Sequence, residues 1–265
     1  MGYVFDFNAA SAFEKWFNRA NNSFAIDLQN KLMIDLLKPQ RNETVLGIGC
    51  GTGASIIPFL DIGLQATAID PSPYMLDIKR ANLGNRVDMH RGFAEDLPFE
   101  DNSFNYACMI ACLEFTENPK KAIEEACRTA KNKLYIGVFN KYALKSIERR
   151  IQGVFTSTFF NRARFFSIGE LKLMIRDLLG DVPITWKTVC PFPSANGNMS
   201  QRIQRSKIIQ RCPFGEYTGI AVTLVPRFKT NPLTLKYKTK PTRGVLATKK
   251  SLNVTKQQND SRKSV

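Results

Sequence analysis

The sequence is poor in histidine, and its one close pair of cysteines, Cys108 and Cys112, has no second pair to complete a metal site. His90 is the single histidine among 265 residues, and none of the six cysteines stands in a C-x-x-C spacing. Structural zinc sites are usually built from such pairs together with histidine, so we expect no metal site. Most of the cysteines lie in apolar segments, which is typical of reduced thiols in a cytoplasmic protein.

Long apolar runs are also absent. No stretch approaches the roughly 20 apolar residues that a membrane-spanning helix needs. The N-terminal sequence MGYVFDFNAASAFEKWF lacks the basic and then apolar regions of a secretory signal. We therefore expect a cytoplasmic protein without a transmembrane segment. Its 43% hydrophobic and 23% charged residues are typical of a globular chain.

Acidic residues become scarce toward the C-terminus. Residues 227–265 hold eleven Lys or Arg and one acid, Asp260, and so carry +10 of the formal net charge of +15. Aromatic residues are absent from 238–265, and this composition predicts a disordered basic tail. Such a tail suits binding to nucleic acid or to an anionic membrane surface. The alternative is an extension that only raises solubility.

Strand-like and helix-like segments alternate over the first 140 residues. Apolar spacing predicts helices over 9–20 and 23–38, the second capped by Ser23 and stopped by Pro39. Five strand-like segments follow with helical segments between most of them, namely TVLGI, QATAID, VDMHRGF, FNYACMIACL and KLYIGVF. This alternation predicts βαβ units and an α/β fold built on an open, doubly wound sheet.

Four glycines crowd the segment VLGIGCGTGAS, residues 45–55, directly after the first predicted strand. Glycine lets a ligand lie against the backbone, and ligands of such sheets bind beyond the carboxyl ends of the strands. Asp70 ends the second predicted strand, where a carboxylate can accept hydrogen bonds from ribose hydroxyls. A second interpretation has Asp70 cap the next helix. NAD and S-adenosylmethionine (SAM) both carry that ribose, so both cofactors stay open at this point.

A third segment distinguishes the two cofactors. GFAEDLPFEDNSFNYACMIACLEFTENPKKAIEEACR, together with VLGIGCGTG and AIDPSPYML, resembles the type 11 family of class I SAM-dependent methyltransferases, in order over residues 43–139. The resemblance implies a Rossmann-like methyltransferase sheet with SAM as the methyl donor. The cofactor-binding residues that it implies are Gly47, Gly49, Cys50, Gly51, Thr52, Gly53, Asp70, Pro71, Met75, Phe93, Ala94 and Glu95.

Two of these positions depart from the family pattern. Gly47 stands where the family usually has an acid, and Phe93 stands where an Asp is common. Each departure removes a polar contact to the cofactor, so the resemblance also leaves open a protein that binds SAM without catalysis.

The resemblance further implies where an acceptor binds. Glu114, after the fourth predicted strand, falls where the substrate-facing residues of the family lie, and it is the candidate catalytic residue, as an acceptor contact or as a base. The alternative is a solvated acid at a helix entry. Phe13, Trp16 and Phe17 resemble the N-terminal element that folds over the cofactor, and core packing is the alternative for them.

Arg162 and Arg164 complete the candidate substrate pocket. They precede a helix that Ser167 and Glu170 are expected to cap as a capping box. The predicted organisation is an N-terminal pair of helices that covers the cofactor (1–40), a SAM-binding core (41–140), a helical cap or substrate insertion (141–180), strands that complete the sheet (181–237) and the basic tail (238–265).

These observations favour a SAM-dependent methyltransferase that acts on a small, partly apolar or anionic acceptor. The sequence lacks the N-P-P-[YF] and D-P-P-Y motifs of enzymes that methylate the amines of bases, and it lacks a Pro-Cys nucleophile. Three alternatives remain: an RNA methyltransferase that uses the basic tail, a non-catalytic SAM-binding protein, and an NAD-dependent oxidoreductase.

Overall fold

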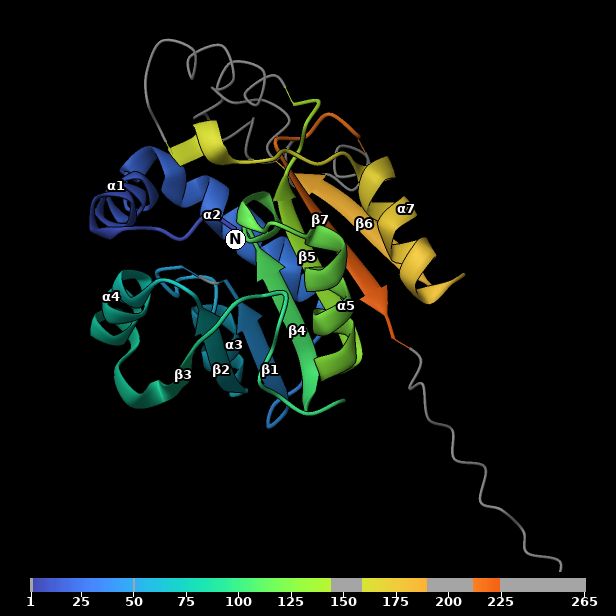
Figure 1. Cartoon of the computed structure of the whole chain (residues 1–265), viewed down its shortest axis with the longest axis horizontal. Coiled ribbons are helices and arrows are strands. Elements are labelled where there is room, and N and C mark those ends of the chain that lie inside the picture. The colour runs from blue at the N-terminus through green and yellow to red at the C-terminus, as the bar shows by residue number, and fades with distance from the viewer. Residues whose placement is uncertain (1, 50, 144–158, 190–211, 225–265) are drawn as a thin grey trace, which may run out of the picture. The chain divides into compact units, whose positions relative to one another are not determined.

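A seven-stranded sheet in the order β3-β2-β1-β4-β5-β7-β6 organises the fold (Figure 1). The computed structural model describes residues 2–49, 51–143, 159–189 and 212–224. Contacts divide the chain into Met1–Arg227 and Phe228–Val265, and the described residues all belong to the first unit. Its strands are β1 (Thr44–Ile48), β2 (Gln65–Asp70), β3 (Val87–Arg91), β4 (Phe104–Ile110), β5 (Ala130–Phe139), β6 (Ile184–Val189) and β7 (Tyr217–Thr223).

Helices connect most of these strands. The α-helices are α1 (Phe7–Phe17), α2 (Ala20–Leu37), α3 (Ile57–Ile62), α4 (Pro73–Leu83), α5 (Pro119–Thr129) and α7 (Ile168–Leu179). Short 3-10 turns are η1 (Gly84–Arg86), η2 (Leu113–Phe115) and η3 (Phe159–Arg162).

The first five strands are parallel, and β7 runs antiparallel to both β5 and β6. Apolar residues fill both faces of the central strands because helices cover both sides. The predicted open, doubly wound α/β sheet is therefore confirmed. Parallel strands place their carboxyl ends at one edge, so the turns after β1, β2, β4 and β5 meet there.

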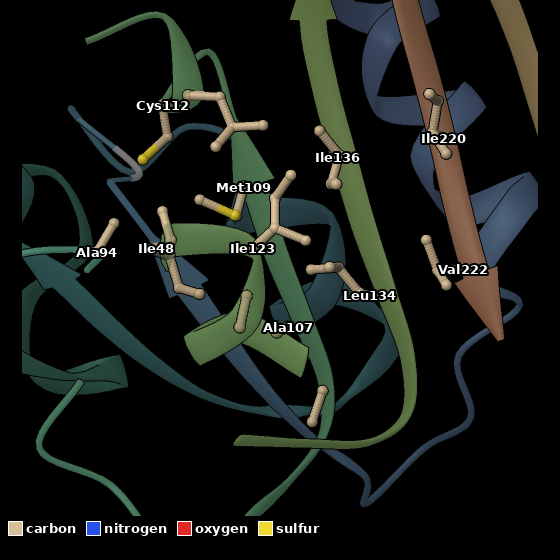
Figure 2. Packing of buried hydrophobic residues seen from close by; sticks show 14 of the residues in the cluster. Ile48, Ala94, Ala107, Met109, Cys112, Ile123, Leu134, Ile136, Ile220 and Val222 are labelled. Atoms are coloured by element: carbon tan, nitrogen blue, oxygen red, sulfur yellow. The ribbon is translucent and has the colours of Figure 1, made fainter. Parts of the chain in front are cut away.

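The two faces of the sheet carry separate cores. On one face, Leu32 and Leu37 of α2 and Phe59 of α3 pack against the strands. On the other face, Ile123 of α5 and Leu171 of α7 join buried residues of the central strands. Figure 2 shows part of this second cluster, with residues of β1, β4, β5, α5 and β7 side by side. The carboxyl edge is thus fixed by packing from both sides.

The structure corrects one predicted helix cap and confirms another. Helix α2 begins at Ala20 with Arg19 at its N-cap and no side-chain cap bond, so Ser23 lies inside the helix. Only two residues, Asn18 and Arg19, connect α1 to α2. The spacing of apolar residues does not show where one helix ends and the next begins when the connection is so short. At α7 the predicted capping box of Ser167 and Glu170 is confirmed.

Helix α7 packs on the sheet. Leu171 and Ile175 are fully buried in the cluster that covers the central strands, and Asp177 pairs with Lys120 of α5 at 3.5 Å. The apolar stripe of α7 therefore faces the sheet, and the predicted cap over 141–180 stays a prediction. Residues 144–158 and the predicted tail, 238–265, lie outside the described residues.

Candidate cofactor and acceptor site

The glycine loop after β1 has the backbone that only glycine adopts readily. Gly49, Gly51 and Gly53 have φ angles of +60°, +49° and +85°, in the left-handed region where a Cβ causes strain. A Cβ on Gly49 would collide with the side chain of Cys112, and one on Gly53 would stand 2.7 Å from Cγ of Lys79. The glycines therefore let the loop backbone pack closely on Cys112 and Lys79 at the carboxyl edge.

Gly47 differs from the other three glycines of this segment because it lies within a strand. Gly47 lies inside β1, where it pairs with Ala68 of β2 and Cys108 of β4. The position at which the family usually has an acid is therefore central in the sheet and here carries no side chain. Cys50 lies outside the described residues, while its neighbour Thr52 is buried.

Asp70 lies directly beside the glycine loop. One carboxylate oxygen accepts the Gly51 N–H at 3.2 Å and the other accepts the Ser72 N–H at 3.0 Å. Burial raises the pKa of Asp70, while the charge of Lys79 and the two N–H groups oppose that rise. The cap of α4 is Ser72, whose hydroxyl accepts the Met75 N–H at 3.3 Å. The interpretation of Asp70 as the helix cap is thus wrong.

Side chains of α1 and α4 meet over Gly51. Phe13 Cε1 lies 3.5 Å and Met75 Sδ 4.0 Å from the place of a Cβ on that residue. Met75 is buried, and Pro71 lies at the turn between Asp70 and α4. The role of these residues at the border of the cofactor stays a prediction. Phe13, predicted for the substrate pocket, lies against the glycine loop.

The loop after β3 brings three predicted residues to the same edge. Ala94 is buried beside the central strands, as Figure 2 shows, while Phe93 is 37% exposed. The Glu95 carboxylate accepts the Glu117 N–H at 2.9 Å and the Asn118 N–H at 3.4 Å. Glu95 therefore closes the turn before α5, and its contact with the adenine stays a prediction.

Sequence reasoning missed the two residues that hold this loop. Arg128 of α5 donates to the carbonyl oxygens of Phe99 at 2.7 Å and Leu97 at 2.9 Å. Glu125 accepts the Leu97 N–H at 3.1 Å, and its hydrogen bond from Arg128 lowers its pKa. The i, i+3 spacing of Glu125 and Arg128 in EEACR was the available signal.

The N-terminal segment runs across the carboxyl edge. The Tyr3 N–H donates to the Phe115 carbonyl at 2.9 Å, near the end of β4. The Ser72 hydroxyl donates to the Phe5 carbonyl at 2.6 Å, near the end of β2. The ring of Phe5 lies edge-on to Phe13 of α1. The chain thereby bridges the turns after β2 and β4 before α1 begins.

Aromatic rings from α1, β5 and the segment before α7 lie next to one another. Trp16 and Phe139 have ring centroids 6.4 Å apart, and Phe139 and Phe165 have centroids 6.5 Å apart. Phe17 stacks on Phe13 at 6.2 Å. The predicted aromatic residues therefore gather beside the glycine loop.

Both predicted arginines stand on aromatic rings at this edge. The Arg162 guanidinium lies 4.7 Å from the centroid of Tyr3, and that of Arg164 lies 5.0 Å from the centroid of Phe166. Both arginines are exposed. Stacking on a ring restrains a guanidinium while its N–H groups face outward, so the pair presents fixed positive charge beside the aromatic residues.

Glu114 lies at the centre of this arrangement and is 2% exposed. Its Oε1 accepts the Phe139 N–H at 2.8 Å, and its backbone carbonyl accepts the Arg164 N–H at 2.9 Å. Its Oε2 is buried without a hydrogen-bond partner among the described residues. Burial raises the pKa of Glu114 to about 8. The alternative of a solvated acid is wrong, and a carboxyl group of this pKa can exchange a proton near neutral pH.

The described residues offer neither a metal-binding group nor a membrane-spanning helix. They contain no group of three or more His, Cys, Asp or Glu side chains that is suited to a metal ion. None of the helices in the described ranges combines the length and apolar character required to cross a membrane.

Known proteins resemble this chain in sequence and in fold. A family model described as a methyltransferase domain matches residues 46–136. An uncharacterised protein of Methanocaldococcus jannaschii is 35% identical over 181 residues, which are 66% of this chain and 80% of the relative. A demethylmenaquinone methyltransferase of Renibacterium salmoninarum is 34% identical over 112 residues, so the match spans 42% of this chain and 47% of that protein.

A solved structure matches over most of the chain. It is a SAM-dependent methyltransferase of Thermotoga maritima, described as a possible histamine N-methyltransferase. Its TM-score is 0.64 at 26% identity, and the match covers 82% of this chain and 96% of the other. The family match includes the glycine loop, Asp70 and Glu114.

Proposed function

Because the chain belongs to the class I SAM-dependent methyltransferases with a type 11 methyltransferase domain, we propose that it methylates a small, partly apolar or anionic acceptor. The single observation that supports this acceptor class is the group of aromatic rings flanked by Arg162 and Arg164 beside the glycine loop. Membership of this family supports an enzyme that uses SAM over the two alternatives, an NAD-dependent oxidoreductase and a non-catalytic SAM-binding protein.

The described residues fit SAM as the methyl donor. At Gly51 the loop leaves room, because a Cβ there would stand 3.5 Å from Phe13 and 4.0 Å from Met75, and the methionine part of SAM lies against this backbone in our proposal. Asp70, a buried acceptor, holds the ribose hydroxyls, while Ala94 and Glu95 border the adenine. SAM supplies a methyl group that is already activated on a sulfonium, so the chain mainly has to align the acceptor.

The acceptor side combines apolar and charged contacts. Trp16, Phe139 and Phe165 offer aromatic faces, and the two arginines offer donors to an anionic group. Glu114 takes the proton that the acceptor loses when its carboxyl group is ionised, a form whose share rises as the pH approaches its pKa of about 8. In this proposal Oε2 receives the proton, since Oε1 is engaged by the Phe139 N–H.

The test uses radiolabelled SAM and a panel of acceptors that share one apolar body and differ in charge. The Arg162→Ala/Arg164→Ala double variant is expected to lose about tenfold or more in kcat/KM for the anionic members. Neutral members should change by less than about threefold, because they do not use the two guanidinium groups. The matched control is Arg176→Ala, an exposed arginine on α7. Equal losses for all members would refute the anionic half of the proposal.

Glu114→Gln tests the proton step. It keeps an acceptor for the Phe139 N–H but cannot take a proton, so kcat is expected to fall by about 10²-fold or more at pH 8 while KM changes little. An unchanged kcat with an acceptor that must lose a proton would exclude Glu114 as the base.

A further inference from the structure

Lys79 of α4 is fully buried, which is rare for a lysine. Its stem lies under the third glycine of the loop: a Cβ on Gly53 would stand 2.7 Å from Cγ of Lys79 and 3.4 Å from Cδ. The glycine loop therefore packs on this side chain. Burying an ammonium group is costly unless its charge is compensated nearby, so the position of Lys79 calls for an electrostatic explanation.

Asp70 is a buried group of opposite charge at the same glycine loop. Its carboxylate is buried at the end of β2, it accepts N–H groups from both Gly51 and Ser72, and the charge of Lys79 acts on it. Each of the two groups thus offsets part of the cost of burying the other.

Other charges around Asp70 are less suited to this role. Arg91 pairs with Asp70 across β2 and β3, but it is exposed and donates to the Pro71 carbonyl at 3.3 Å. Glu95, in the loop after β3, is engaged by the N–H groups before α5. On the β1 side, Gly47 contributes no charge.

We propose that Lys79 is a positioning residue for the cofactor, acting through Asp70. Its buried positive charge keeps Asp70 as a carboxylate, which accepts both ribose hydroxyls, instead of a neutral acid that donates its own hydrogen. Its stem also supports the backbone of the glycine loop. This inference rests on the ribose-binding role proposed for Asp70.

The experiment is calorimetric titration with S-adenosylhomocysteine between pH 5.5 and 8.5, which measures binding without turnover. Lys79→Met keeps the length of the stem and removes the charge. Its dissociation constant is expected to rise by about threefold or less at pH 8 but by tenfold or more at pH 6, because Asp70 takes up a proton at higher pH when the counter-charge is gone. The wild type and Lys31→Met, a variant at an exposed lysine of α2, should show a much smaller change between the two values.

A double-mutant cycle separates this mechanism from a structural role. In the Asp70→Asn background, which has no titrating carboxylate, adding Lys79→Met should change binding by less than about twofold at either pH. A pH-independent loss in Lys79→Met, or an equal loss in the Asp70→Asn background, would overturn the inference. Lys79→Gln carries the same expectation, and thermal unfolding of each variant reports whether it is folded.

The same data test the role of Asp70 by itself. If Asp70→Asn binds S-adenosylhomocysteine as the wild type does, the proposed ribose contact is wrong. If Asp70→Asn loses binding but Lys79→Met follows the wild-type pH profile, the contact stands and only the inference on Lys79 fails.

Discussion

Among single residues, Glu114 links pH to the stability of the fold. Its folded pKa, about 8, lies above the ordinary value of 4.5, so the folded state holds a proton that the unfolded state releases between these values. The free energy of unfolding is therefore expected to fall as pH rises from 5 to 8, by at most about 1.4 kcal/mol per pH unit from this group. Glu114→Gln should remove that contribution.

Urea unfolding at pH 5, 6, 7 and 8 measures the difference between wild type and variant. Glu100→Gln, at an exposed acid, serves as the control and should follow the wild type. If the gap between wild type and Glu114→Gln stays constant over this range, the proton on Glu114 does not contribute to stability in the way its burial indicates.

A substitution at Gly49 tests whether the glycine loop needs a residue without a side chain. Gly49→Ala adds a methyl group that collides with Cys112 and forces a left-handed φ on alanine. We expect a destabilisation of about 2–4 kcal/mol and a loss of SAM binding of about 100-fold or more. Gly84→Ala also has a positive φ, +58°, with ψ at −141° and no atom within 4 Å of the new Cβ, so it should show only backbone strain, about 1–3 kcal/mol. Equal effects of the two substitutions would contradict the role of the contact with Cys112.

The glycine loop and Asp70 could be predicted from the sequence because their chemistry is local. Three glycines and one carboxylate follow two strands, and strand order brings them together. Lys79 could not be predicted in this way, because its burial depends on the approach of Gly53, which is 26 positions away. The environment of Glu114 likewise depends on Phe139 and Arg164, which are distant along the chain.

At the scale of elements, α5 fixes the loop that borders the adenine in our proposal. Arg128→Met removes hydrogen bonds to the Leu97 and Phe99 carbonyls and the ion pair with Asp101 at 2.8 Å. It also leaves Glu125 without its guanidinium partner. We expect a loss of about 2–3 kcal/mol in the free energy of unfolding. Hydrogen exchange over residues 92–103 should accelerate, and affinity for SAM should weaken.

The control for this loop is Lys121→Met. Lys121 is half-exposed and pairs with Glu124 at 3.3 Å and Glu125 at 3.8 Å, so removing it should cost less than about 1 kcal/mol. Exchange rates in 92–103 that are the same in Arg128→Met and Lys121→Met would show that the loop is held by its apolar contacts instead.

Element order was readable from the sequence, whereas some boundaries and partners were not. Runs such as TVLGI and QATAID predict buried parallel strands because apolar residues fill both faces. Apolar spacing predicts that a segment is helical, but it does not show what the apolar side of the helix packs against. The apolar stripe of α7, which includes Leu171 and Ile175, could cover either a substrate pocket or the sheet. In the structure α7 packs on α5 and the central strands.

At the scale of the whole chain, positive charge is concentrated in the C-terminal segment. Residues 238–265 hold eight Lys or Arg and one acid, while the described cofactor residues all lie before residue 120. A variant that ends at Tyr237 is therefore expected to keep its thermal midpoint within about 2 °C and its affinity for S-adenosylhomocysteine within about twofold.

The same truncation decides between the two acceptor classes. Since binding of RNA by a basic segment falls with salt by a slope of about −0.7 for each neutralised phosphate, the full chain should bind single-stranded RNA with a steep salt dependence that the truncated chain lacks. If the acceptor is small, methyl transfer to it should be unchanged by truncation, because Arg162, Arg164 and Glu114 remain. If the acceptor is RNA, methylation should disappear together with RNA binding, and the small-acceptor proposal would be wrong.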